Sequence, residues 1–194
     1  MRLVLASASP RRRDLLAQAG LVFTMVSPDV DESTRSGETP TDYVIRLAEE
    51  KARAVWEPGA VVIGADTVVV IDGDIIGKPA DSQAARGMLG QLSGRRHLVH
   101  TGVAVIDAVG EVQVERETTL VTMAVLSEND IQRYVATGEP LDKAGAYALQ
   151  GIGGLFIEGV EGSVSNVVGL PLTAAFRLLR KAGIDTWESG PQIG

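Results

Sequence analysis

The run from Ala60 to Ile71 constrains the fold most, because it is a long apolar stretch rich in β-branched residues. It predicts a buried central strand, with a break at Asp66 where Gly64-Ala65-Asp66-Thr67 interrupts the valines and isoleucines. Asp72-Gly73 follows directly and is typical of a hairpin turn. A buried strand of this kind, in a chain that also carries helical patterns, favours an α/β domain built around a sheet.

The start of the chain predicts a strand over 2–6 and then a helix over 11–19, with Ser9 as its N-cap, Pro10 in the first turn and Gly20 after its end. Further strands are expected at 23–27, 97–106, 112–125 and 155–158, and further helices at 39–57, 82–92, 127–137 and 171–183. The expected fold is a mixed, partly antiparallel central sheet flanked by helices. We expect one domain over residues 1–187 and a flexible tail over 188–194.

Composition narrows the classes of partner. The net charge is −7 and aromatic residues make up 4% of the chain, which argues against binding a nucleic acid polymer through charge or base stacking. A local basic pocket for a small anion remains compatible with these values. The chain has no cysteine and no apolar run of about 20 residues, so we expect a cytoplasmic protein that does not enter a membrane.

The segment Ser7-Ala-Ser-Pro-Arg-Arg-Arg13 is the first candidate site. It places two hydroxyl groups, three guanidinium groups and the free backbone N–H groups of a helix N-terminus close together, which suits a phosphate. The alternative is an ordinary N-cap followed by surface arginines. We favour the anion site, because cations are disfavoured in a first helical turn and three in succession need an explanation.

Asp66 is the second candidate, because it is the only charged residue inside the run from Ala60 to Ile71. A buried carboxylate is costly to desolvate unless it meets a cation or hydrogen-bond donors. An aspartate that caps the loop before Thr67 is an equally good explanation. Lys78 follows a stretch that resembles a Walker A loop, but Pro79 stands where Ser or Thr is required.

Lys51 and Lys143 are candidates comparable to Lys78, although each alone is more often a surface lysine. Acidic residues that can supply oxygen ligands for Mg²⁺ are Asp31, Glu32, Asp66 and Asp81, and the commoner alternative for each is a solvated loop. His97 and His100 are three residues apart on an expected strand, so they cannot jointly bind a metal ion. These groups suit a phosphate ester but do not identify a reaction.

Six segments are considered together and in chain order: Leu5-Ala-Ser-Ala-Ser-Pro-Arg-Arg12, Tyr43-Val-Ile-Arg-Leu-Ala-Glu-Glu-Lys-Ala52, Gly64-Ala-Asp-Thr67 through Gly77-Lys-Pro79, Leu92-Ser-Gly-Arg95 with His100-Thr-Gly102, Asp142-Lys-Ala-Gly-Ala-Tyr147 with Gln150-Gly151, and Val168-Gly-Leu-Pro171. As a set they resemble the Maf family of nucleoside triphosphate pyrophosphatases, which are related in fold to the inosine triphosphate pyrophosphatases. The resemblance implies hydrolysis of a nucleoside triphosphate to the monophosphate and pyrophosphate. It also implies a divalent metal cation, Mg²⁺ or Mn²⁺, and a homodimer.

The resemblance also implies roles for individual residues. Asp66 matches the proton acceptor, Lys51 and Lys78 match active-site lysines, and Glu32 falls where the family has an acid near the metal, so Glu32 and Asp66 are the expected metal ligands. The phosphate-contacting loop corresponds to Ser7, Ser9, Arg11 and Arg12, and positions tied to base choice in the dTTP and UTP branch correspond to Arg11, Thr67 and Gln150.

Two other functions remain as alternatives. One is a nucleotide-binding regulator of septum formation with little turnover, and the joint presence of Asp66, Lys51 and Lys78 favours an enzyme over it. The other is a phosphatase or a kinase-like phosphotransferase. The product separates them, because pyrophosphate requires attack at the α-phosphorus and orthophosphate requires attack at the γ-phosphorus.

Overall fold

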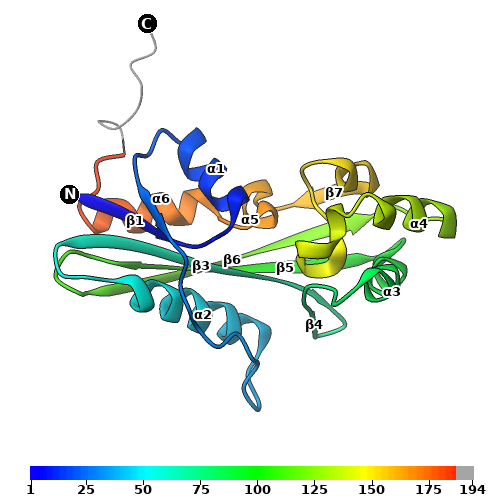
Figure 1. The fold of residues 1–194 in the computed structure, drawn as a ribbon, viewed down its shortest axis with the longest axis horizontal. Helices are drawn as coiled ribbons and strands as arrows, with labels where there is room; N and C mark the ends of the chain where they lie inside the picture. The colour runs from blue at the N-terminus through cyan, green and yellow to red at the C-terminus, as the bar shows by residue number, and fades with distance from the viewer. Residues whose placement is uncertain (187–194) are drawn as a thin grey trace, which may run out of the picture. The chain divides into compact units, whose positions relative to one another are not determined.

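The computed structural model describes residues 1–186 and shows a mixed α/β fold (Figure 1). The strands are β1 (Arg2–Ala6), β2 (Thr24–Val26), β3 (Ala60–Ile71), β4 (Asp74–Ile76), β5 (Arg96–Ile106), β6 (Val112–Met123) and β7 (Ile157–Glu161). The α-helices are α1 (Pro10–Gln18), α2 (Pro40–Val55), α3 (Ser82–Leu92), α4 (Glu128–Ala136), α5 (Val164–Val168) and α6 (Leu172–Lys181). Short 3-10 helices span Glu139–Asp142 (η1), Ala144–Ala146 (η2) and Ile152–Phe156 (η3).

The strands form one seven-stranded sheet in the order β2-β1-β3-β5-β6-β7, with β4 paired to β3. Strand β1 is parallel to both β2 and β3, whereas β4 runs antiparallel to β3 and β7 runs antiparallel to β6. The predicted mixed, partly antiparallel sheet is therefore confirmed. Within residues 1–186, no helix has the length and hydrophobicity needed to cross a bilayer.

The chain forms two compact units. The first comprises Met1–Asp66, Thr101–Glu117 and the segment from Gly169 onward, and the second comprises Thr67–His100 and Thr118–Val168. Strands β3, β5 and β6 therefore contribute residues to both units. The single domain expected over 1–187 stays a prediction, and the expected tail over 188–194 lies outside the described residues.

The first unit has helices on both faces of its part of the sheet. Residues on one face of β1 and β3, such as Val4 and Val62, pack with Ala48 and Ala52 of α2. The alternate residues, such as Leu5, are equally buried and point to the other face. Figure 1 shows α1 and α6 on the side of β1 that lies opposite α2.

Two glycines allow α2 to lie directly on the sheet. A Cβ atom at Gly64 of β3 would overlap the carbonyl oxygen of Ala48, and one at Gly102 of β5 would overlap that of Val44. Because both obstacles are helix backbone, no side-chain rotation relieves them. The distance between α2 and the sheet therefore depends on the absence of these two side chains.

The second unit has its own apolar core. Helices α3 and α4 supply Leu89, Leu92, Tyr134 and Val135, which pack with residues of the strands and with Tyr147 of the glycine-rich segment. The hydroxyl group of Tyr147 lies 2.8 Å from Nε2 of His97, and both side chains are buried. The glycine-rich segment is thus anchored in the core of this unit.

Two sequence predictions were wrong in detail. Strand β3 continues through Asp66 without the expected break, because the carboxylate is neutralised by a lysine from α2 and does not need to leave the sheet. The strand expected at 155–158 begins later, at Ile157, after 3-10 helix η3. The pairing of β7 with Leu120–Met123 of β6 sets that start.

Replacement of Gly64 by alanine is expected to lower the free energy of unfolding by ~1–3 kcal/mol, the usual cost of overpacking. The reason is that the new methyl group displaces the backbone of α2. Gly87→Ala is the matched control, because Gly87 lies in α3 with no atom within 4 Å of an added Cβ. That control should raise the free energy of unfolding by about 0.5–1 kcal/mol. Equal effects of the two substitutions in urea denaturation would contradict this account of α2.

Candidate active site

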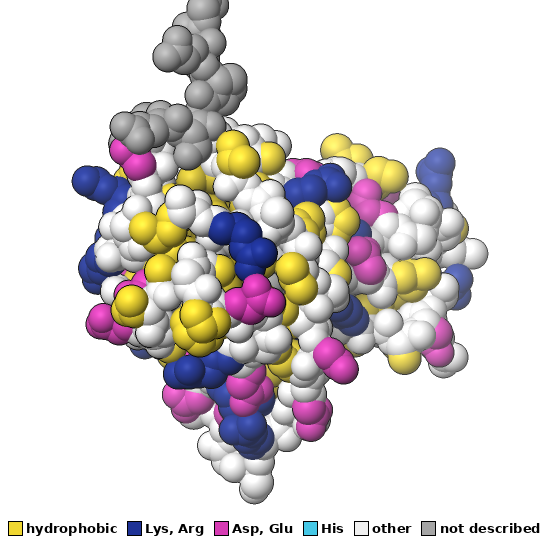
Figure 2. Space-filling model, turned by 60° about the vertical axis from the view of Figure 1, so that its left-hand side comes forward, with side chains coloured by type: hydrophobic (Ala, Val, Ile, Leu, Met, Phe, Trp, Pro, Cys, Tyr) yellow, Lys and Arg dark blue, Asp and Glu magenta, His cyan; other side chains and the backbone are white. Residues whose placement is uncertain are grey.

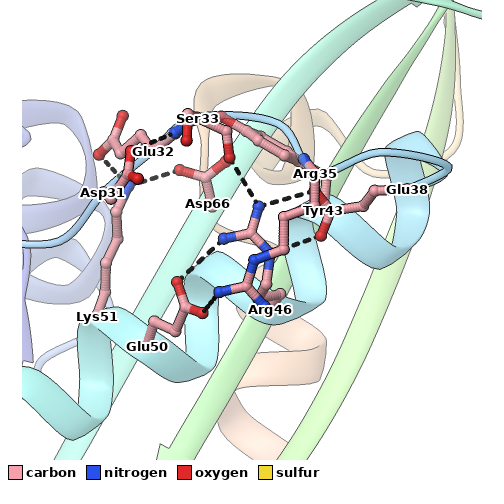
Figure 3. Close-up of polar contacts among 10 residues, drawn as sticks. All are labelled: Asp31, Glu32, Ser33, Arg35, Glu38, Tyr43, Arg46, Glu50, Lys51 and Asp66. Carbon is pink, nitrogen blue, oxygen red and sulfur yellow. Dashed lines mark hydrogen bonds and ion pairs between the residues drawn. The ribbon is translucent and has the colours of Figure 1, made fainter.

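A buried lysine between two carboxylates forms the centre of the candidate site in the first unit (Figure 3). Nζ of Lys51 lies 2.6 Å from Oδ1 of Asp66 and 2.6 Å from Oε1 of Glu32. The side chains of Lys51 and Asp66 are only 8% and 10% exposed, whereas that of Glu32 is 52% exposed. The structure thus brings together three of the residues predicted from the sequence, and two of them are removed from solvent.

The periodicities of α2 and β3 explain why Lys51 meets Asp66. Residues alternate in a strand, so Asp66 lies on the same face of β3 as Gly64, which contacts α2. On α2, Lys51 follows Leu47 by one turn and lies on the buried face of the helix. The contact of α2 with Gly64 therefore places the lysine above the next inward-facing residue of the strand.

Burial dominates the electrostatics of Asp66. It raises the pKa of the carboxyl group above its ordinary value, and the charge of Glu32 adds to that effect. The charges of Lys51 and Arg12 lower the pKa but do not offset the burial. Asp66 is therefore a stronger proton acceptor than an exposed aspartate, while its ion pair with Lys51 favours the ionised form.

The turn from Ser7 to Arg12 adopts the predicted cap. Oγ of Ser9 accepts the backbone N–H of Arg12 at 3.4 Å, and Oγ of Ser7 accepts the backbone N–H of Ser9 at 3.1 Å. Ser7 is buried, Ser9 and Arg11 are half-buried, and Arg13 is exposed. The hydroxyl group of Ser9 thus caps α1 as the sequence predicts, and Arg13 points away to pair with Asp14.

Arg12 folds back across this turn instead of extending into solvent. Its Nε donates to the carbonyl oxygen of Gly169 at 2.7 Å, and its Nη1 donates to Oγ of Ser7 at 3.4 Å. Burial lowers the pKa of Arg12, and the charges of Asp66 and Glu32 act in the opposite direction. Arg12 is therefore not the surface arginine of the alternative interpretation.

The two carboxylates on Lys51 are a suitable donor set for a hard divalent cation. Mg²⁺ is commonly bound by one or two protein carboxylates together with substrate phosphates, so Glu32 and Asp66 fit that requirement. Among residues 1–186, no group of three or more His, Cys, Asp or Glu side chains gathers in a way that would hold a metal ion. A metal bound here would complete its coordination with oxygen atoms from water or from the substrate.

Thr67, Lys78 and Gln150 belong to the second unit. Thr67 is half-buried on β3, directly after Asp66 in the chain, whereas Lys78 and Gln150 are exposed. The side chain of Gln150 makes no hydrogen bond within the part of the chain that the structure describes.

Polar anchors hold the backbone on both sides of Gln150. The hydroxyl group of Tyr134 accepts the N–H of Ala148 at 3.2 Å and donates to Oε1 of Glu139 at 2.8 Å. The same carboxylate accepts the N–H groups of Ile152 at 3.1 Å and Gly153 at 2.9 Å. The exposed glutamine thus stands on a turn whose backbone is fixed.

Sequence reasoning missed these anchors and also Tyr43 and Arg46, which contact the loop that carries Glu32. The spacing of Arg46 and Glu50 at i and i+4 was a visible signal of an ion pair on α2. Nothing in the sequence connects Arg46 with the loop before the helix.

Figure 2 shows Lys and Arg side chains interspersed with Asp and Glu over one face, without a broad field of either sign.

Comparison with known proteins gives consistent results at the level of sequence. Residues 2–182 match the family described as Maf-like protein. The chain is 55% identical over 191 residues to a dTTP/UTP pyrophosphatase of Anaeromyxobacter dehalogenans, covering 96% of this chain and 97% of that protein. It is 54% identical over 184 residues to a dTTP/UTP pyrophosphatase of Pelotomaculum thermopropionicum, covering 93% and 96%.

Among solved structures, a similar one is a nucleoside-triphosphatase or dITP/XTP pyrophosphatase from Mycobacterium abscessus, at 16% identity and a TM-score of 0.42, covering 94% of this chain and 97% of that chain. The sequence matches extend over nearly the whole chain and include all the segments that carry the candidate site residues. The chain therefore belongs to the Maf-like protein family.

Proposed function

We propose that the protein hydrolyses nucleoside triphosphates to the monophosphate and pyrophosphate, with dTTP, UTP or modified pyrimidine nucleotides as substrates. Such a reaction removes unwanted nucleotides from the cellular pool. The observation that carries the proposal is the buried Lys51 held between Asp66 and Glu32. The names of the relatives from Anaeromyxobacter and Pelotomaculum, both dTTP/UTP pyrophosphatases, support the same reaction and substrates.

The basic and hydroxyl groups are assigned to the triphosphate. Ser7, Ser9, Arg11 and Arg12 form the N-terminal turn of α1, where backbone N–H groups and guanidinium groups favour an anion. Lys51 contributes a further positive charge from α2. Lys78 matches an active-site lysine of the Maf family and is assigned to the substrate phosphates as well.

Asp66 is assigned to the attacking water. In this step the water oxygen forms a bond to the α-phosphorus, the bond from that phosphorus to the bridging oxygen breaks, and pyrophosphate leaves. The proton released by the water passes to the carboxylate of Asp66, whose pKa is raised by burial. Lys51 holds that carboxylate in place at 2.6 Å, and its positive charge favours the ionised form.

Glu32 and Asp66 are the residues that would hold a divalent cation, Mg²⁺ or Mn²⁺, together with phosphate oxygens. When bound, such a cation neutralises charge on the phosphate oxygens and polarises them. Nζ of Lys51 lies 2.6 Å from each carboxylate, so its positive charge partly offsets their negative charge.

Removal of divalent metal by a chelator is expected to stop hydrolysis, because the charge of the phosphate oxygens is then no longer neutralised by the cation.

Arg11, Thr67 and Gln150 are assigned to the choice of base. The carboxamide of Gln150 offers one donor group and one acceptor, which matches the imide N–H and carbonyl groups of uracil and thymine. Its exposure and the lack of a partner among the described residues leave both groups available to a ligand. A purine presents a different pattern and a larger ring, so it is expected to bind less well.

The regulator of septum formation is the weaker alternative, because a protein that only binds nucleotides has no need of a carboxylate buried against a lysine. The homodimer and the cytoplasmic location stay predictions from the sequence.

The decisive assay incubates the protein with dTTP, UTP, ATP or GTP and with Mg²⁺ or Mn²⁺. Monophosphate with pyrophosphate is the expected product. Orthophosphate would indicate attack at the γ-phosphorus, and binding without any product would favour the regulator.

Replacement of Asp66 by asparagine is expected to lower kcat by at least about 100-fold, because the amide keeps the shape but cannot accept the proton. The protein should still fold, since Lys51 keeps the carboxylate of Glu32 as its partner. Asp72→Asn is the control, because Asp72 is an exposed aspartate that pairs with Arg95. Near wild-type turnover in Asp66→Asn, measured by pyrophosphate release, would remove Asp66 from the mechanism.

Charge reversal of Arg12 is expected to raise KM for the triphosphate by roughly tenfold to a hundredfold, the usual effect of losing a hydrogen bond to a charged group. Arg13→Glu is the matched control, because Arg13 is the next residue of α1 but is exposed and pairs with Asp14. Thermal denaturation of both variants checks whether loss of the Gly169 contact unfolds the protein. Equal KM values for Arg12→Glu and wild type would mean that Arg12 does not contact the substrate.

Replacement of Gln150 by alanine is expected to reduce the ratio of kcat/KM for dTTP to that for GTP by about tenfold, mainly by slowing dTTP hydrolysis. The loss follows from unpaired groups on the pyrimidine edge. Gln91→Ala is the control, since Gln91 is an exposed glutamine of α3. A purine triphosphate as the best substrate of the wild-type protein would defeat the pyrimidine assignment but not the pyrophosphatase assignment.

A further inference from the structure

The loop that carries Glu32 has little apolar packing of its own. It spans residues 27–39 between β2 and α2, contains no helix or strand, and is exposed over most of its length. A hollow of about 380 Å³ separates part of it from α2, lined by Val30, Asp31, Ser33 and Arg35 of the loop and by Arg46, Glu50 and Arg53 of the helix. Hydrophobic contacts therefore do not explain the position that the loop takes.

The ion pair of Glu32 with Lys51 is also insufficient to hold the loop. The carboxylate of Glu32 is half exposed to water, and ion pairs with an exposed member contribute little to stability. Ordering a loop residue costs conformational entropy that such a pair scarcely offsets. Other contacts must fix the position of Glu32.

Tyr43 of α2 provides one such contact, directly at Glu32. Its hydroxyl group donates a hydrogen bond of 2.8 Å to the backbone carbonyl oxygen of Glu32. The ring of Tyr43 is 9% exposed and is therefore held by the packing of α2. The bond ties the backbone of the acidic residue to a rigid helix, as Figure 3 shows.

Arg46, one turn further along α2, provides further contacts, and the exposed Arg35 of the loop adds an ion pair of 2.8 Å with Glu50 of the helix. Nε and Nη2 of Arg46 donate to the two carboxylate oxygens of Glu38 at 2.5 and 2.8 Å, and Nη2 also donates to the carbonyl oxygen of Ser33 at 3.1 Å. Its Nη1 donates to Glu50 at 3.0 Å, and its guanidinium group lies 5.4 Å from the ring centre of Tyr43. Three of its four hydrogen bonds reach the loop, on either side of Arg35 (Figure 3).

The Arg46–Glu38 pair is mostly removed from solvent, since the two side chains are 12% and 8% exposed. Hydrogen bonding to Arg46 lowers the pKa of Glu38 to about 2. The pair therefore stays charged over the whole range in which the protein would be assayed. This bidentate pairing fixes the orientation of the Glu38 carboxylate relative to Arg46, which a lysine at the same position cannot do.

We propose that Tyr43 and Arg46 are positioning residues, which hold loop 27–39 against α2 so that the carboxylate of Glu32 reaches Lys51 beside Asp66. The proposal rests on the proposed function, because it assigns the effect of both residues to the proposed catalytic centre. Neither residue is needed to attach α2 to the sheet, since the backbone contacts at Gly64 already set that distance. Their loss should therefore loosen the loop and leave the helix in place.

The test is a double-mutant cycle between Tyr43→Phe and Glu32→Gln. The phenylalanine keeps the packed ring and removes only the hydroxyl group that holds Glu32. In the wild-type background, Tyr43→Phe should lower kcat for dTTP by about threefold to tenfold, with little change in KM. In the Glu32→Gln background, it should have no further effect, because both changes act through one carboxylate. An equal loss in the two backgrounds, or no loss in either, would overturn the proposal.

Arg46→Lys supplies a second variant in which the positive charge is kept and the paired contact with Glu38 is lost. Hydrogen–deuterium exchange should become faster in loop 27–39 of Arg46→Lys and Tyr43→Phe, while the amides of α2 keep their protection. Arg53→Lys is the matched control on the same helix, because Arg53 lines the same hollow but, within the described chain, forms its ion pair with Glu49 and not with the loop. Exchange in the loop that is unchanged in both variants would also overturn the proposal.

These measurements separate two kinds of failure. If the wild-type protein releases no pyrophosphate from any triphosphate, the proposed function fails, and the exchange measurement still decides whether Tyr43 and Arg46 hold the loop. If pyrophosphate is released but kcat does not depend on Tyr43, the positioning role fails and the proposed function stands.

Discussion

The close approach of α2 to the sheet is the constraint on which the candidate site depends. The helix backbone at Ala48 and Val44 lies where side chains at Gly64 and Gly102 would otherwise be. A larger separation would draw Nζ of Lys51 away from Asp66, and a hydrogen bond of 2.6 Å does not tolerate such a shift. Two residues without side chains thus determine the geometry of the two charged groups that the proposed reaction needs.

The charged centre is costly to bury and is arranged to limit that cost. Lys51 and Asp66 are almost fully removed from water, and an isolated charge in that position would be strongly unfavourable. Each has the other as a partner, and the half-exposed Glu32 adds a second negative charge to the lysine. The excess negative charge faces the side on which Glu32 meets solvent. A cation or a basic residue is therefore favoured there, and the charge of Arg12 already interacts with both acids.

Local signals in the sequence were sufficient for much of this structure. Ser9 and Thr39 cap α1 and α2 as their sequence context predicts, since each cap depends only on residues within one helical turn. The break expected at Asp66 was wrong because the partner of that residue, Lys51, is distant in sequence and comes from a different element. The contacts of Arg46 with Glu38 and of Tyr134 with Glu139 could not be predicted for a related reason. Arginine and glutamate side chains are usually solvated, and only the fold shows that these ones are paired with partners inside the protein.

The glycine-rich segment shows how a sequence can indicate a loop without revealing its rigidity. The glycines between 139 and 169 disfavour long helices and strands, and this stretch forms only short elements, namely η1, η2, η3, β7 and α5. At Gly153, however, a side chain would overlap the hydroxyl group of Tyr134, so this glycine is required by close packing. The turn beside Gln150 is therefore pressed against a buried tyrosine and hydrogen-bonded to Glu139. The backbone of such a turn loses little conformational freedom when a ligand binds, so less of the binding free energy is spent on ordering the loop.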